Sequence, residues 1–226
     1  MPSLADLSIP GGWSIRQVKI DPFDFELLTP TDPDAVLGEL EAPQDASQPH
    51  LADPYWAKLW PAAPLLAQAL VHNPPPKGTR VLELGCGSGL VGLTALACGL
   101  DVTFSDYVPL AVELAQENAA RNHLPKARGL VLDWHVRGSG NSEAFPLILA
   151  ADVTYDRTKL DALLAVLSER LASGGQAWFG DAGRSPAPDF VSRAQARGWQ
   201  VASYDDCDCL ETEFVLGQFR RLVLTK

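Results

Sequence analysis

The sequence predicts a doubly wound α/β fold, in which a mostly parallel seven-stranded sheet is covered by helices on both faces. Three observations predict it. Strand-like apolar runs alternate with helical patterns from about residue 54 onward, a glycine-rich turn joins the first such run to a helix, and an acidic residue follows or ends each of the first four runs. A chain of 226 residues is long enough for one such domain with an N-terminal addition.

The first fifty residues differ in pattern from the rest. Residues 14–20 and 23–27 alternate with period two on either side of Asp21-Pro22, which predicts a β-hairpin. Residues 31–34 are typical of a helix start, so we expect a short helix over 35–41, followed by a polar connector over 43–49. We therefore expect an N-terminal extension over residues 1–50 and the main domain over residues 51–226.

The main domain opens with a helical pattern over residues 60–71, which ends before the triple proline at 74–76. Strands are then predicted over 80–84, 101–105, 129–132, 147–151, 176–180, 199–204 and 217–225, and helices over 90–98, 109–122, 158–172 and 188–197. The last two strands follow each other without a helix, so one of them should lie antiparallel. We expect Arg220 and Arg221, on the last strand, to be solvated charges at the sheet edge.

The most informative segment spans residues 81–92. Its strand-like run contains Glu83, and Gly85, Gly87 and Gly89 alternate just before the next helix. Glycines permit positive φ and let a ligand approach backbone N–H groups at a helix N-terminus. Roughly 20 residues beyond the turn, the second strand delivers Asp106, which is well placed to accept hydrogen bonds from two ribose hydroxyls. The segment predicts an adenosine-type cofactor.

The identity of that cofactor depends on Glu83. Residues 87–92 satisfy G-x-G-x-x-G, which alone permits NAD, but a carboxylate at Glu83 would repel a pyrophosphate. It would suit a cationic amino-acid group, and S-adenosylmethionine carries a sulfonium and an ammonium without a phosphate. The segment resembles motif I of the class I, seven-strand S-adenosylmethionine-dependent methyltransferases. The resemblance implies a Rossmann-like fold and a cofactor site that includes Gly85, Cys86, Gly87 and Gly89.

Other strand ends add candidate cofactor contacts. Tyr107 follows Asp106 and could lie against adenine, Asp133 could accept from the adenine amino group, and Trp134 could stack on the ring. Ala151, at the end of the fourth strand, is expected to border the cofactor. The alternative for each acid is an ordinary cap or turn residue after a strand.

An aromatic segment before the first strand and a D-x-x-Y sequence after the fourth narrow the resemblance. Trp60, within residues 54–61, is expected to close over the methionine end of the cofactor, although these rings could simply cap the sheet. Together with Asp152 and Tyr155 of D-x-x-Y, the pattern resembles the lysine methyltransferases called family 16. Residues 180–184, G-D-A-G-R, are similar to the G-D-P-G-R segment of the electron-transfer flavoprotein β-subunit lysine methyltransferases, with Ala182 in place of proline. The resemblance covers roughly residues 50–200.

Composition argues against several other classes of function. The net charge of −10 and a pI near 4.8 speak against binding a phosphate backbone, so no nucleic-acid partner is expected. The four cysteines form neither a disulfide framework nor a paired C-x-x-C set, and we predict no metal site. With no membrane-length apolar run and no basic n-region followed by an apolar stretch, the expectation is a cytoplasmic protein, and a monomer is favoured.

The resemblance implies an S-adenosylmethionine-dependent N-methyltransferase that acts on a protein lysine. Asp152 is assigned to positioning the acceptor nitrogen and Tyr155 to shaping its channel. Three alternatives stay open: a small-molecule amine N-methyltransferase, a non-catalytic S-adenosylmethionine-binding partner subunit, and an NAD-binding protein, which Glu83 opposes. The acidic net charge favours a basic, lysine-bearing partner surface.

Overall fold

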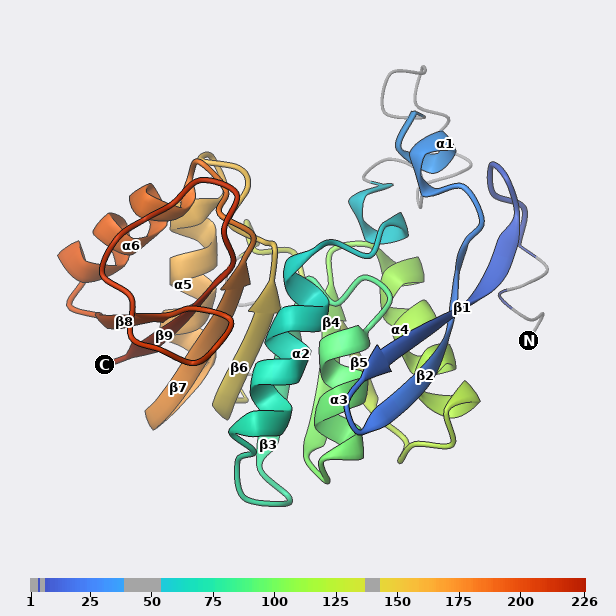
Figure 1. Cartoon of the computed structure of the whole chain (residues 1–226), viewed down its shortest axis with the longest axis horizontal. Coiled ribbons are helices and arrows are strands. Elements are labelled where there is room, and N and C mark those ends of the chain that lie inside the picture. Colours follow the sequence, from blue (N-terminus) through green and yellow to red (C-terminus); the bar gives the residue numbers. More distant parts are fainter. Residues whose placement is uncertain (1–3, 5–6, 39–53, 137–142) are drawn as a thin grey trace.

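A computed structural model describes residues 4, 7–38, 54–136 and 143–226 (Figure 1). The N-terminal part holds the predicted hairpin, β1 (Trp13–Ile20) paired antiparallel with β2 (Phe23–Pro30), and the short helix α1 (Pro33–Gly38). The connector expected over 43–49 lies outside the described residues, and the boundary expected near residue 50 stays a prediction.

The main part alternates strands and helices as the sequence predicts. After the 3₁₀ helix η4 (Pro54–Ala57), the elements are α2 (Ala62–His72), β3 (Arg80–Leu84), α3 (Leu90–Ala97), β4 (Asp101–Asp106), α4 (Pro109–Arg121), β5 (Arg128–Val131), β6 (Phe145–Ala151), α5 (Leu160–Arg170), β7 (Leu171–Asp181), α6 (Ala187–Ala196), β8 (Gln200–Tyr204) and β9 (Arg220–Thr225).

The sheet has seven strands in the order β5-β4-β3-β6-β7-β9-β8. All neighbours from β5 to β7 are parallel, and β9 runs antiparallel to both β7 and β8. The Rossmann-like architecture with one antiparallel strand is therefore confirmed. Because the chain crosses from β3 to β4 on one side and later returns to β6 on the other, the carboxyl ends of β3 and β6 flank the topological switch point, where such sheets bind ligands.

The expectation that Arg220 and Arg221 are solvated edge charges is wrong. The chain inserts β9 between β7 and β8, so its side chains lie in the interior of the sheet, and both arginines are buried. The Arg221 guanidinium lies 4.5 Å from the ring centroid of Trp178 and 4.8 Å from that of Tyr204, and it is paired with Asp208. Strand order in space is not visible in a linear pattern of apolar residues.

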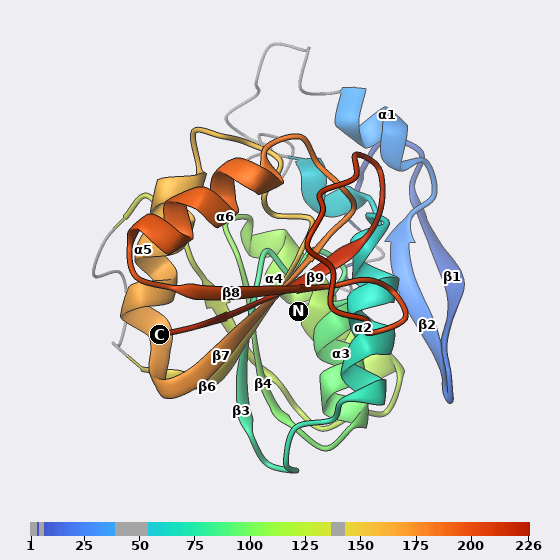
Figure 2. The same cartoon turned by 60° about the vertical axis from the view of Figure 1, so that its left-hand side comes forward.

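Alternate residues of the central strands face two separate cores. Val81 of β3 and Leu149 of β6 join α2, α3 and α4 in one core, whereas Leu82 and Ile148 join α5 and α6 in the other. The two helical layers are seen on either side of the sheet when the molecule is turned (Figure 2). Continuous apolar strands such as β6 are what a sheet buried on both faces requires.

The hairpin packs on the outside of the first helical layer. Ile20, Phe25 and Leu27 belong to the same core as α2 and α3. Asn118 of α4 and Asn122, which caps the end of that helix, bind the backbone of β2. Among the described helices, none combines the length and apolar character needed to cross a bilayer.

Candidate active site

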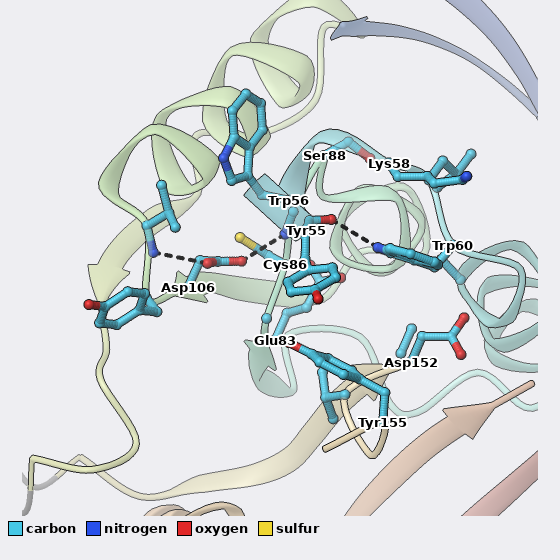
Figure 3. Close-up of a pocket in the computed structure, with 18 of the residues that line it drawn as sticks. Tyr55, Trp56, Lys58, Trp60, Glu83, Cys86, Ser88, Asp106, Asp152 and Tyr155 are labelled. Carbon is cyan, nitrogen blue, oxygen red and sulfur yellow. Dashed lines mark hydrogen bonds between the residues drawn. The ribbon is translucent and has the colours of Figure 1, made fainter. Parts of the chain in front are cut away.

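A cavity of about 430 Å³ opens at the carboxyl ends of β3, β4 and β6, roofed by η4 and the segment before α2. Every residue predicted to bind the cofactor or the acceptor lines this cavity, with the exception of Gly89. In Figure 3, Asp106 lies at one end, Trp60 and Asp152 lie at the other, and Glu83 lies between them. The sequence therefore brings together a site whose parts are up to 95 residues apart.

The glycine turn and Asp106 hold each other in place. The Gly87 N–H donates to Asp106 Oδ2 at 3.1 Å, and Asp106 Oδ1 accepts from the Val108 N–H at 3.0 Å. Gly87 has a φ of 50°, and a Cβ there would come no nearer than 3.4 Å to any other group, the carbonyl of Trp56. Gly87 thus leaves open space at the cavity wall, where a ligand can approach the backbone.

Gly89 serves a different purpose. It is the left-handed N-cap of α3, with φ of 84°, and a Cβ there would lie 2.7 Å from Ala115 Cβ of α4. Its lack of a side chain allows α3 and α4 to approach each other. Gly89 therefore supports the turn from behind and does not line the cavity.

Glu83 is a buried carboxyl at the centre of the cavity wall. Its Oε2 accepts a hydrogen bond from the Gly92 N–H at 3.0 Å. Burial raises its pKa to about 8 and the nearby negative charge of Asp106 adds to the rise, while the Gly92 bond opposes it. A cation bound beside Glu83 would favour the ionised form, so the site is suited to a positively charged ligand group.

Exposed and half-buried aromatic residues line the end of the cavity beyond Asp106. Tyr107 is 54% exposed at the rim, and Asp133 Oδ1 accepts from the His135 N–H at 2.8 Å. The indole N–H of Trp134 is buried and has no hydrogen-bond partner among the described residues.

The opposite end of the cavity is walled by three aromatic rings. Tyr55 lies 5.2 Å from the ring of Tyr155 and 6.2 Å from that of Trp60, whose indole N–H donates to the Tyr55 carbonyl at 2.9 Å (Figure 3). Lys58 lies 5.5 Å from the Trp60 ring centroid, and Lys159 lies 5.7 Å from that of Tyr155. Sequence reasoning did not assign Tyr55, Lys58 or Lys159 to the site, and the position of Lys58 and Tyr55 beside Trp60 was the available signal.

Asp152 stands next to this wall in an unusual conformation. It is a non-glycine residue with a φ of 55°, and its side chain is 1% exposed. Its Oδ2 accepts from the Ala62 N–H in the first turn of α2 at 2.8 Å, and its Oδ1 accepts from Arg184 Nε at 3.0 Å. Backbone conformations of this kind are maintained only where the surroundings fix them, and they are found often at functional sites.

Three potential metal ligands lie close together elsewhere among the described residues. Asp205, Asp206 and Cys207 lie within 4.8 Å of one another, at half-buried and exposed positions on the loop after β8. None of them lines the cavity. Exposed acidic groups commonly cluster in this way without an ion, so the cluster does not bear on the site.

The residues of the cavity fit S-adenosylmethionine. Glu83 can face its cationic amino-acid part, the second lone pairs of the Asp106 oxygens can face ribose hydroxyls, and Trp134 lines the cavity as well. The carboxylate of Asp106, and that of Glu83 once it is ionised, would oppose the pyrophosphate of a dinucleotide. The fold and the cavity together are those of a class I S-adenosylmethionine-dependent methyltransferase.

Within that class, the chain belongs to the family described as lysine methyltransferase (methyltransferase family 16), which matches residues 46–184. It is 34% identical over 167 residues to the electron transfer flavoprotein beta subunit lysine methyltransferase of Xenopus laevis, covering 71% of this chain and 65% of that protein. It is also 34% identical over 116 residues to the histone-arginine methyltransferase METTL23 of Homo sapiens, covering 48% of this chain and 60% of that protein.

A solved structure with the same fold is the TehB-like SAM-dependent methyltransferase from Corynebacterium glutamicum, with a TM-score of 0.60 at 24% identity over 72% of this chain and 87% of that one. The match to the family model over residues 46–184 confirms the family expected from D-x-x-Y and motif I. The chain spans 65% and 60% of the two curated relatives named above, less than two thirds of each.

Proposed function

We propose that this protein transfers a methyl group from S-adenosylmethionine to the side-chain nitrogen of a lysine in a partner protein. The observation that carries the proposal is the cavity itself, which joins Glu83 and Asp106 to the D-x-x-Y residues Asp152 and Tyr155 along one wall. Membership of the lysine methyltransferase family and the name of the Xenopus laevis relative support a lysine as the acceptor.

In the proposed reaction, S-adenosylmethionine supplies an electrophilic methyl group on a sulfonium. The backbone of Gly87 and the carboxyls of Glu83 and Asp106 would hold it, with Trp134 and Tyr107 beside the adenine. The cavity residues then have two tasks, which are alignment of the acceptor nitrogen and exclusion of water. Alignment alone can supply several kcal/mol of the barrier reduction.

The acceptor end must also deal with a proton. A lysine amine has an ordinary pKa of about 10.4, so it must lose a proton before its lone pair can attack. We propose that Asp152 orients the amine through lone pairs not used by Ala62 and Arg184, and that Tyr155 walls the channel with Tyr55. Desolvation between these rings disfavours the ammonium form and so favours loss of the proton.

A direct test is to incubate the protein with S-adenosylmethionine carrying a labelled methyl group in a lysate of its source cells. The labelled product is then separated into protein and small-molecule fractions, and labelled protein is hydrolysed to amino acids. Label in methyl-lysine supports the proposal. Label in methyl-arginine, as the name of the METTL23 relative suggests for that protein, or in a small amine would replace lysine as the acceptor.

Replacing Asp152 separates binding from chemistry. Asp152→Ala should bind S-adenosylmethionine nearly normally and lose methylation on the order of a hundredfold or more, because alignment of the nitrogen is lost. Tyr155→Phe should lose less, since its ring still walls the channel. Calorimetry and initial rates on the identified acceptor decide the matter. Full turnover by Asp152→Ala would remove the acceptor-site assignment.

The proposal also covers the partner, the compartment and the oligomeric state of the protein. A net charge of −10 favours a basic partner surface over a nucleic acid. All four cysteines are free thiols, which fits a reducing compartment such as the cytoplasm. We propose that the protein acts there as a monomer.

A further inference from the structure

The G-D-A-G-R segment at the end of β7 lies directly against the strand end that carries Asp152. Gly180 of β7 is the register partner of Ala151 of β6, and the Asp152 N–H donates to the Gly180 carbonyl at 2.8 Å. The residues that follow Gly180 therefore start beside Asp152, at the acceptor end of the cavity. The similarity of residues 180–184 to G-D-P-G-R did not by itself indicate a role for them.

The turn after Gly180 is fixed on both sides. The side chain of Asp181 is buried, and its carboxylate accepts from the Arg184 N–H at 2.8 Å and from the Thr154 hydroxyl. Gly183 has a φ of 73°, and the Gly217 N–H donates to its carbonyl at 3.0 Å. These bonds leave the backbone of Arg184 little freedom.

From that fixed turn, the Arg184 side chain reaches two parts of the cavity wall. Its Nε donates to Asp152 Oδ1 at 3.0 Å, and its guanidinium carbon lies 5.2 Å from the centroid of the Trp60 ring. Because the Ala62 N–H donates to the other oxygen, both carboxylate oxygens of Asp152 accept a hydrogen bond. Only 31% of the Arg184 side chain is exposed.

We infer that Arg184 is a positioning residue, which fixes the Asp152 carboxylate and the Trp60 ring in the geometry that the acceptor nitrogen requires. The inference rests on the proposed function. A planar guanidinium can donate an N–H in its plane while it interacts with an aromatic ring, and an ammonium lacks this shape. With Arg184 removed, Asp152 would keep a single donor from the Ala62 backbone and could rotate. A misplacement of about 1 Å at a reacting centre can cost a hundredfold in rate.

The first experiment compares Arg184→Ala and Arg184→Lys with the control Arg193→Ala. Arg193 of α6 makes an ion pair with Asp161, also 3.0 Å long, which lies outside the cavity. Arg184→Ala should lower kcat about 10- to 100-fold and leave the calorimetric Kd for S-adenosylmethionine within about threefold. Arg184→Lys should recover part of the loss, and Arg193→Ala should behave as wild type. Unchanged kcat in Arg184→Ala would overturn the inference.

A double-mutant cycle distinguishes positioning from a general structural role. If Arg184 acts through Asp152, the double variant Asp152→Ala, Arg184→Ala should be no slower than Asp152→Ala alone. Multiplied losses in the double variant would show that Arg184 acts independently of Asp152, and the inference would fall.

A third measurement needs no turnover and so separates this inference from the proposed function. Arg184→Ala should change tryptophan emission in the protein without ligand, because the cation beside Trp60 is lost. The same substitution in a Trp60→Phe background should produce no change. An equal change in both backgrounds would contradict the contact. If wild-type protein methylates no lysine, the proposed function fails whatever the emission shows.

Discussion

The carboxyl of Glu83 has to satisfy two opposite demands. Without a ligand it is buried, and burial raises its pKa to about 8, so at neutral pH it is mostly protonated. With a cationic ligand beside it, the charged form becomes the favoured one. Binding of the ligand and release of a proton from Glu83 are therefore linked.

The linkage has a defined sign. We expect S-adenosylmethionine affinity to increase as pH rises toward about 8, because binding at lower pH must first remove the proton from Glu83. Calorimetry at pH 7 in buffers of different ionisation enthalpy should show proton release for wild type and none for Glu83→Gln.

The apo protein offers a check on the same group. Its folded state binds the proton more tightly than the unfolded state does. The contribution of Glu83 to the free energy of unfolding is therefore fully present below a pH of about 4.5 and is lost as the pH rises through about 8. The Gln variant should lack this decline. Proton release that persists in Glu83→Gln would assign it to another group.

At the scale of elements, two glycines in the strand-turn-helix from β3 to α3 have different roles. Gly87 faces the cavity, where a side chain has room, whereas Gly89 lies against Ala115 of α4. We predict that Gly87→Arg still folds, with some left-handed strain at its φ of 50°, and loses S-adenosylmethionine binding, because its side chain occupies the ligand space. Gly89→Ala should instead lower the free energy of unfolding by about 1–3 kcal/mol, through left-handed strain and crowding.

Urea unfolding and calorimetry on both variants check this division. Normal affinity in folded Gly87→Arg would mean that the turn is structural only. A Gly89→Ala protein as stable as wild type would show that α3 and α4 can separate at no cost. Either result would contradict the roles that the positions of these two glycines indicate.

Much of this element structure was predictable, because strand and helix periods are local properties of the sequence. β3 matches its predicted bounds, and α3 and α4 differ from theirs by one residue at the C-terminal end. The largest difference is at the junction of α5 and β7, where the strand begins at Leu171, five residues before the predicted start. Residues 171–175 include Gly174 and Gly175 and show no strand period. Of these five, Leu171 is the one that pairs with β6, opposite Phe145, and the register shifts before Gln176 meets Leu147.

For the molecule as a whole, the predictable part of the site was the part governed by sheet topology. Carboxyl ends of parallel strands meet at one edge, which is why Glu83, Asp106 and Asp152 could be grouped from the sequence. The contact of Arg184 with Asp152 and the position of Lys159 depend on how loops fold back over that edge. No periodicity encodes such contacts.

The hairpin is joined to the site through one buried side chain. Asn118 of α4 accepts from the Leu28 N–H at 2.7 Å, and its amide donates to the Leu28 carbonyl at 3.2 Å and to the Ser88 carbonyl at 3.0 Å. Ser88 belongs to the glycine turn. A single residue of α4 thus connects β2 of the N-terminal hairpin with the loop that would hold the cofactor.

We predict that Asn118→Ala lowers the free energy of unfolding by about 2–3 kcal/mol, because buried backbone groups of Leu28 and Ser88 lose their partners. It should also weaken S-adenosylmethionine binding severalfold, because the Asn118 amide no longer holds the Ser88 carbonyl of the glycine turn in place.

Asn122→Ala is the matched control. Asn122 lies one turn later on the chain and binds the backbone of Glu26 and of Asn118 but not the glycine turn, so its loss should affect unfolding alone and by about 1 kcal/mol. Urea unfolding and calorimetry on the two variants measure both quantities. Equal affinity for S-adenosylmethionine in Asn118→Ala and Asn122→Ala would show that the hairpin stabilises the fold without supporting the site.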